Sequence, residues 1–207
     1  MAGRMDSIVS KMGERELSRI KCIPSDMKNV VLLRQWRDDD FEQFAEMNAD
    51  LEVMRFFPKP LTRTESEEFF SRVRACFDAQ GWGLWALEVG GAFAGFTGLA
   101  YPSFSAHFTP CVEIGWRLRR EYWGRGIAYA AALAAQAYAF ERLKLNELVS
   151  FTSATNTRSR RLMERLGFIR NSKDDFLHPL LEPDNPLCPH VLYRKSIESY
   201  KPLCSPR

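Results

Sequence analysis

The sequence has few cysteines, and they are not arranged for cross-linking or metal binding. The five cysteines are odd in number, lie far apart and never form a C-x-x-C pair. This spacing argues against a disulfide framework and a zinc ribbon. The three histidines, His107, His178 and His190, have no second ligand pair at zinc spacing. We therefore expect reduced thiols and no metal site.

Long apolar runs are also missing. No stretch reaches the roughly 18 consecutive apolar residues that a membrane span needs. Charges interrupt the opening segment MAGRMDSIVSKMGERELSRIK every few residues, which is unlike the apolar core of a signal peptide. The sequence therefore predicts a soluble, cytoplasmic protein that does not associate with a membrane.

A strong excess of charge of one sign is absent as well. The chain has 29 Lys and Arg against 26 Asp and Glu, a net charge of +3, whereas nucleic-acid binders usually carry a clustered basic stripe. We expect no nucleic-acid partner. Two short basic groups fit a small polyanion such as a phosphorylated cofactor, or are solvated helix and loop faces. They are Arg117, Arg119, Arg120 and Arg125, and Arg158, Arg160 and Arg161.

What the chain does contain suits one globular domain. Its 207 residues are 45% hydrophobic and 13% aromatic, enough to fill a sizeable core. Residues 1–28 form a mixed-charge arm in this interpretation, and residues 29–207 form a single domain.

Within the domain, the patterns predict a mixed sheet with helices on it, an α/β fold. Thr62 or Thr64 can cap a helix after Leu61, with a glutamate three residues on. Gly90-Gly91 is expected to turn a hairpin of two antiparallel strands. The expected strands are VVLLRQW, WGLWALEV, AFAGFTGLAY, CVEIGWRL, NELVSFTS and VLYRKSI, and the expected helices are FEQFAEMNAD, the segment after Leu61, AYAAALAAQAYAFERLKL and NTRSRRLMERLGF.

The most informative stretch is CVEIGWRLRREYWGRGIA, from Cys111 to Ala128. A strand runs into a loop with Gly124 and Gly126, and an Ala-rich helix follows at once. Backbone N–H groups at a helix N-terminus can bind phosphate oxygens, and glycines let the backbone approach an anion closely. A plain strand–helix turn is the alternative. The phosphate loops G-x-x-x-x-G-K-[ST] and G-x-G-x-x-G are both absent.

These residues resemble the cofactor-binding segment of the GNAT superfamily, above all the branch that acetylates ribosomal-protein N-termini (RimJ/RimL-like). The superfamily's pyrophosphate signature is [QR]-x-x-G-x-[GA]. Its two last fixed positions fall on Gly124 and Gly126, but its first position is Glu121 here, where the family has Gln or Arg. Downstream, NTRSRRLMERLGF resembles the family's Asn-x-x-Ser helix closing on Gly-Phe, and upstream GWGLWALEV resembles the branch's second strand.

The resemblance implies a mixed, mostly antiparallel central sheet with helices on both faces and splayed central strands that hold acetyl-coenzyme A. It implies transfer of acetyl to a primary amine by direct attack. A backbone N–H near Ile114 or Gly115 would stabilise the oxyanion. The cofactor-binding residues it implies are Ile114, Gly115, Trp116, Leu118, Arg119, Gly124, Arg125, Gly126, Ile127, Ala128, Asn156 and Ser159.

Glu113 is the candidate general base, directly or through water; alternatively it faces solvent or pairs with an arginine. Ser159 is the candidate general acid, or a small residue that allows close helix packing. Many family members place a Tyr seven residues after the motif Asn, where this chain has Met163, so that role does not transfer.

Two other interpretations stay open at this point. A non-catalytic acyl-coenzyme A-binding module would keep the fold without the chemistry, which Glu121 and Met163 favour. An unrelated α/β interaction domain would have no coenzyme A site. Within the enzyme hypothesis the acceptor is a protein N-terminus, a small amine or a lysine, and the family suggests a homodimer. Phe56-Phe57-Pro58 is either a wall of the acceptor site or a buried loop.

Overall fold

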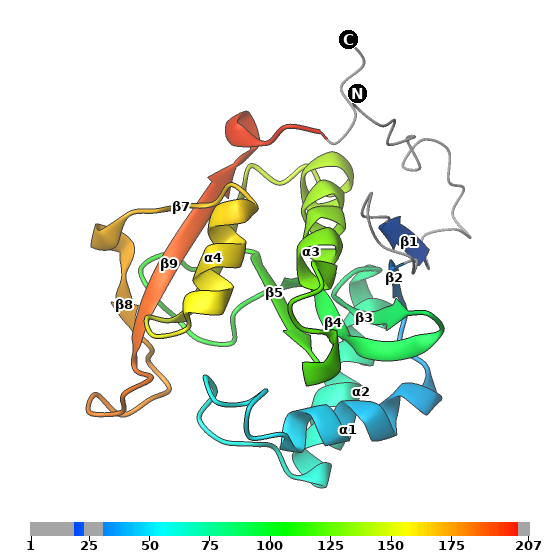
Figure 1. Cartoon of the computed structure of the whole chain (residues 1–207). Coiled ribbons are helices and arrows are strands. Elements are labelled where there is room, and N and C mark those ends of the chain that lie inside the picture. Colours follow the sequence, from blue (N-terminus) through cyan, green and yellow to red (C-terminus); the bar gives the residue numbers. More distant parts are fainter. Residues whose placement is uncertain (1–18, 23–30, 203–207) are drawn as a thin grey trace.

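One sheet runs through nearly the whole domain in this computed structural model, which describes residues 19–22 and 31–202 (Figure 1). Its strands are β1 (Arg19–Cys22), β2 (Val31–Arg34), β3 (Leu84–Val89), β4 (Ala92–Ala100), β5 (Glu113–Leu118), β6 (Glu147–Ser153), β7 (Ile169–Arg170), β8 (Phe176–Leu177) and β9 (Pro189–Ser196). The helices are α1 (Phe41–Ala49), α2 (Arg63–Gln80), α3 (Ile127–Ala137) and α4 (Thr157–Arg165). Short helical turns are η1 (Asp38–Asp40), η2 (Arg120–Tyr122), η4 (Ser172–Asp174) and η5 (Ile197–Ser199), and η3 (Tyr138–Arg142) is π-helical.

The sheet is mixed and mostly antiparallel, as the sequence and the resemblance predict. Its order is β1-β2-β3-β4-β5-β6-β9-β7, with β8 paired to β9. Among the described strands, only β5 and β6 pair in parallel, and a single bridge between Glu113 and Val149 joins them. β4, by contrast, pairs with β5 over six positions. β5 is therefore held firmly on one side and loosely on the other.

Helices lie on both faces of the sheet, and α3 and α4 appear together in front of it in Figure 1. On the α1 and α2 side, Phe44 and Phe69 place their rings 6.2 and 5.7 Å from Phe96 of β4. α3 is built largely from alanines that are almost fully buried. Small side chains let its backbone lie close to the sheet, which fixes the start of α3 relative to β5.

Local signals set the helix ends where the sequence places them. Thr62 caps α2 by accepting a hydrogen bond from the N–H of Glu65, whose side chain binds back to Thr62, a capping box. α2 ends at Gly81, which has φ 76°. Gly167, with φ 81°, follows α4 as predicted. These two glycines take the left-handed conformation that other residues adopt at a cost.

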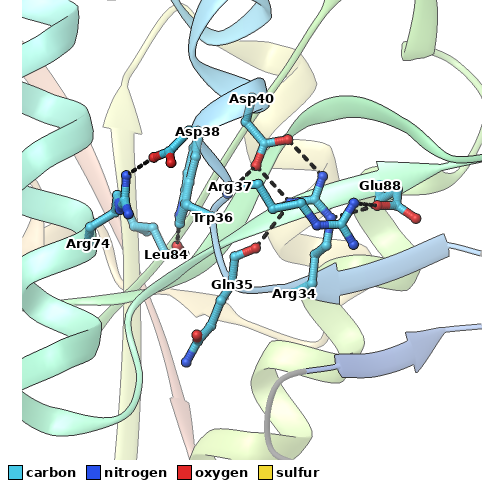
Figure 2. A network of polar contacts seen from close by, with 9 residues as sticks. All are labelled: Arg34, Gln35, Trp36, Arg37, Asp38, Asp40, Arg74, Leu84 and Glu88. Carbon is cyan, nitrogen blue, oxygen red and sulfur yellow. Dashed lines mark hydrogen bonds and ion pairs between the residues drawn. The ribbon is translucent and has the colours of Figure 1, made fainter.

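A buried ion network ties β2 to β3 and to the start of α1 (Figure 2). The guanidinium of Arg34 binds Asp40 at 2.7 Å and Glu88 at 2.6 Å, and all three residues are almost fully buried. Arg37 adds a second contact to Glu88 at 3.1 Å. The carboxylates therefore compensate the buried charge of Arg34, and the network fixes the entry to α1.

The N-terminal arm is described only in part. Residues 19–22 form β1, which pairs antiparallel with β2, so this piece of the predicted arm adds an edge strand to the sheet. The other residues of the predicted arm lie outside the described residues. The boundary at residue 29 stays a prediction.

Candidate functional site

The first feature of the candidate site is the edge of β5 that faces β6. Successive residues of a strand direct their N–H and C=O groups to opposite edges. The N–H of Arg119 donates to Ala94 at the β4 side, so the groups of Ile114, Trp116 and Leu118 face β6. The Ser150 hydroxyl indeed donates to the Ile114 carbonyl at 2.9 Å.

Beyond the bridge, that edge of β5 has no ladder partner among the described strands. A parallel bridge of this register uses the N–H of Ile114, while Gly115 faces β4. The Leu118 carbonyl accepts from the indole N–H of Trp123 at 2.8 Å. The first free N–H and C=O in the gap therefore belong to Trp116. The oxyanion donor near Ile114 or Gly115 stays a prediction: the N–H groups of these two residues are directed to β6 and β4, so Trp116 offers the nearest free N–H on this edge.

The second feature is the N-terminus of α3, directly after β5 and η2. Gly124 and Gly126 have φ 70° and 72°, and a Cβ at either would meet nothing within 4 Å. No side chain caps α3 at Gly126. The N–H groups of Ile127 and Ala128, in its first turn, have no intrahelical acceptor, so an anion can be bound there.

An open cleft lies beside this N-terminus. Its lining comes from the loop after α1, from η2 and its C-cap, and from the start of α4: Asp50, Glu52, Arg120, Glu121, Trp123 and Arg158. The guanidinium of Arg158 stands 5.0 Å from the Trp123 ring. Sequence reasoning missed Asp50 and Glu52, because only the folded chain brings the α1–α2 loop next to the glycine loop.

The predicted arginine cluster is dispersed by the fold. Arg119 donates to Gln43 of α1 at 2.8 Å and pairs with Glu121 at 3.0 Å. Arg120 pairs with Asp50 at 3.7 Å. Arg125 is exposed and forms no ion pair among the described residues, although it donates to the Glu121 carbonyl at 3.4 Å. Of the group around the glycines, Arg125 is the one whose charge stays available at the loop.

At the start of α4, Asn156 is held from both sides. Its Oδ1 accepts from the Ser159 N–H at 3.2 Å, which caps the helix, and its Nδ2 donates to Thr152 at 3.0 Å. Ser159 is half-buried, and its hydroxyl makes no hydrogen bond with the described residues. Met163 is 1% exposed and belongs to the core, so an apolar side chain stands where many relatives carry a Tyr.

Glu113 begins β5 at the bridge to β6. Its carboxyl is half-buried and forms no ion pair among the described residues. Burial raises the pKa of Glu113 to about 8, because the charged form loses hydration without a compensating partner. A carboxyl that titrates near neutral pH is suited to accept a proton from an ammonium group.

Two of the three histidines lie elsewhere, directly after β8 and on β9. His178 and His190 have ring centroids 4.8 Å apart and contact Phe176, and burial lowers the pKa of both. Among the described residues no group of three or more His, Cys, Asp or Glu could hold a metal ion. Within the same residues, none of the helices combines the length and apolar character needed to cross a bilayer.

Comparison with known proteins identifies the family of the chain. The model of the acetyltransferase (GNAT) domain matches residues 31–169. The chain is 31% identical over 133 residues to the FsC-acetyl coenzyme A-N(2)-transacetylase of Aspergillus fumigatus, a match that covers 62% of this chain and 57% of that protein. The chain spans about half or less of the length of the curated relatives it matches.

Solved structures share the fold over most of the chain. An acetyltransferase from Agrobacterium tumefaciens is 26% identical with a TM-score of 0.67, covering 93% of this chain and 99% of that one. Mycobacterium smegmatis RimJ, solved in complex with CoA-disulfide, is 22% identical with a TM-score of 0.63, covering 82% and 83%.

Proposed function

Because the chain belongs to the GNAT acetyltransferase family, whose enzymes use acetyl-coenzyme A, we propose that it transfers acetyl from acetyl-coenzyme A to a primary amine of a protein N-terminus or a small molecule. The observation that carries the proposal is the unpaired edge of β5, which leads directly into the uncapped N-terminus of α3. Both features offer backbone donors that have no acceptor among the described residues.

The residues present fit the cofactor. Gly124, Gly126 and the N–H groups of Ile127 and Ala128 would hold the pyrophosphate, helped by the charge of Arg125. Trp116 and Leu118 would bind the pantetheine arm through their β6-facing backbone groups. Asn156 and Ser159, at the start of α4, would border the same arm. When bound, acetyl-coenzyme A supplies an activated acyl group.

Arg119 has a different part in this proposal. Its guanidinium is engaged by Gln43 and Glu121, so we assign it the positioning of η2 rather than a phosphate contact. Trp116 replaces Ile114 and Gly115 as the backbone donor for the oxyanion. Such a donor stabilises developing charge by a few kcal/mol.

Glu113 acts as the general base. A peptide N-terminus has a reference pKa of about 7.7–8.0, close to the pKa of about 8 that burial gives Glu113. Proton transfer between groups of matched pKa is nearly balanced, so the carboxylate can take the proton of the ammonium directly or through water. Ser159, whose hydroxyl has no partner among the described residues, would return a proton to the leaving thiolate.

The test is thermal unfolding with and without acetyl-coenzyme A, comparing the wild type with Gly126→Trp. At about 100 times Kd, the ligand stabilises the folded state by ~2.7 kcal/mol, which raises Tm by roughly 5–10 °C. Gly81→Trp is the matched control, because Gly81 shares the positive φ and the open surroundings but ends α2. We expect the rise in the wild type and the control, and none in Gly126→Trp.

No rise in the wild type at saturating acetyl-coenzyme A would refute the proposal. If the rise occurs, a panel of amines is then assayed for release of free coenzyme A. Binding without transfer to any amine would instead identify a non-catalytic acyl-coenzyme A-binding module.

A further inference from the structure

Arg117 of β5 is an arginine of the motif that has no part in the proposed transfer of acetyl. Its cross-strand partner is Phe96 of β4, and its guanidinium stands 4.0, 5.3 and 5.7 Å from the rings of Phe57, Phe96 and Phe69. Because these rings belong to the α1–α2 loop, to β4 and to α2, the side chain lies on the sheet face that α1 and α2 cover. It therefore points away from α3 and its anion-binding N-terminus.

The charge of Arg117 has no counter-charge among the described residues. Nη1 donates to the Oδ1 of Asn48 at 2.6 Å, while Nε is buried without a partner. Burial lowers the pKa of Arg117 to about 9, which still leaves it charged at neutral pH. The three aromatic rings and Asn48 hold the guanidinium in place but supply no counter-charge. The cation is therefore left to pair with an anionic ligand.

The orientation of the guanidinium is fixed. Asn48 is 0% exposed, and its Nδ2 donates to the Ser66 hydroxyl at 3.3 Å, which directs its Oδ1 toward Arg117. The ring of Phe57 packs against the planar group at 4.0 Å. Most of the N–H donors of Arg117 find no acceptor in the part of the chain that the structure describes, so the arginine is prepared to bind an anion without rearrangement.

Arg117 shares its face of β5 with the proposed base. Side chains alternate along a strand, so Glu113, Gly115 and Arg117 project to the same side. A Cβ at Gly115 would meet only Glu113 Oε1, at 3.7 Å. The strand thus offers a base and a cation about 13 Å apart between Cα atoms, and the strand residue between them on this face is Gly115, which has no side chain.

We propose that Arg117 binds a carboxylate of the acceptor, so that the enzyme acetylates amines that carry a carboxylate several bonds away. This inference rests on the proposed function, since it assumes that the amine reacts beside Glu113. A guanidinium matches a carboxylate in shape and charge. Both an N-terminal peptide with an early acidic residue and a small amino acid with a remote carboxylate have this chemistry. A polyamine would bring positive charge against Arg117 and is disfavoured.

The experiment compares kcat/KM within matched acceptor pairs. The first pair is two peptides that differ only in having Glu or Gln at the second position. The second pair is 6-aminohexanoate and its amide. A fifth acceptor, 1,6-diaminohexane, carries a second cation in place of the carboxylate. We expect wild type to prefer the carboxylate in at least one pair by roughly ten- to hundredfold, mainly through KM. A preference in the peptide pair identifies a peptide acceptor, and one confined to the other pair identifies a small molecule.

In Arg117→Gln the ratio should approach one, with kcat/KM for the amide changed less than threefold. Arg117→Lys should retain part of the preference, and Arg142→Gln, an exposed arginine on η3, should retain all of it. The acetyl-coenzyme A thermal shift must persist in each variant, which verifies folding and separates this test from that of the proposed function.

Three results would overturn the inference while the thermal shift is intact. The first is that wild type shows no preference for the carboxylate in either pair. The second is that the preference survives in Arg117→Gln. The third is that none of the five acceptors is acetylated. A missing thermal shift in wild type would instead refute acetyl-coenzyme A binding itself.

Discussion

Replacing Glu113 by Gln tests whether a half-buried, unpaired carboxyl on β5 makes the protein less stable as pH rises. Burial raises the pKa of Glu113 to about 8 in the folded state, against an ordinary value of 4.5. Glutamine keeps the size and shape of the side chain but cannot ionise. The two proteins therefore differ in one titrating group, which allows its contribution to be isolated.

The direction of the effect follows from proton binding. Below pH 4.5 the carboxyl is protonated in both the folded and the unfolded chain, so it contributes no pH dependence. Between pH 4.5 and about 8 the unfolded chain has released the proton and the folded chain keeps it, so the free energy of unfolding falls by about 1.4 kcal/mol per pH unit. Above about 8 both states are ionised and the loss is constant.

Urea unfolding at pH 5.5, 6.5 and 7.5 measures the effect. We expect the free energy of unfolding of Glu113→Gln, relative to wild type, to increase by on the order of 2–3 kcal/mol over this range. Titrations shared by the two proteins cancel in the difference. Glu68→Gln, at an exposed position of α2, should show a difference that does not change with pH. A difference for Glu113→Gln that is constant within about 0.5 kcal/mol would refute the reasoning.

Three further predictions concern catalysis and the sheet. With an acceptor amine of low pKa, kcat/KM should rise through about pH 8 as the base ionises, and the rise should disappear in the Gln variant; a pH–rate profile shows this. Arg34→Met leaves the buried Asp40 without its ion-pair partner and Glu88 with Arg37 alone, so urea unfolding should show a loss of roughly 3–5 kcal/mol. Gly98→Ala should lower stability by more than about 2 kcal/mol, because φ is 157° and the new Cβ would clash with the Gly83 carbonyl; thermal unfolding tests it.

Much of the fold could be predicted because its signals are local. The capping box at Thr62, the Gly90-Gly91 turn between β3 and β4, and the alanine content of α3 each act within a few residues. The features that were not predicted depend on tertiary pairing. β7 and β8 have two residues each and exist as strands because β9 pairs with them. The π-helical end of α3 at Tyr138–Arg142 has no comparable sequence signal.

The candidate site also combines features that local sequence predicts with features that depend on tertiary contacts. The glycines of the loop and the position of Glu113 on a strand follow from contiguous sequence. The directions of the neighbouring arginines do not. Arg119 and Arg120 find partners in Gln43 and Asp50, which are about 70 residues earlier in the chain. A basic cluster in the sequence therefore did not predict a basic cluster in space.

The alternation of β5 explains how one short segment can serve two substrates. Residues at even positions, such as Trp116, direct backbone groups to the open edge beside β6, where the cofactor is proposed to bind. Residues at odd positions direct side chains to the face under α1 and α2, where Glu113 and Arg117 flank Gly115. The two sets interleave at single-residue spacing, so a shift of β5 by one residue against β4 would reverse both. The firm pairing with β4 holds this register, and under the proposed function the amine would reach the thioester from the side opposite α3.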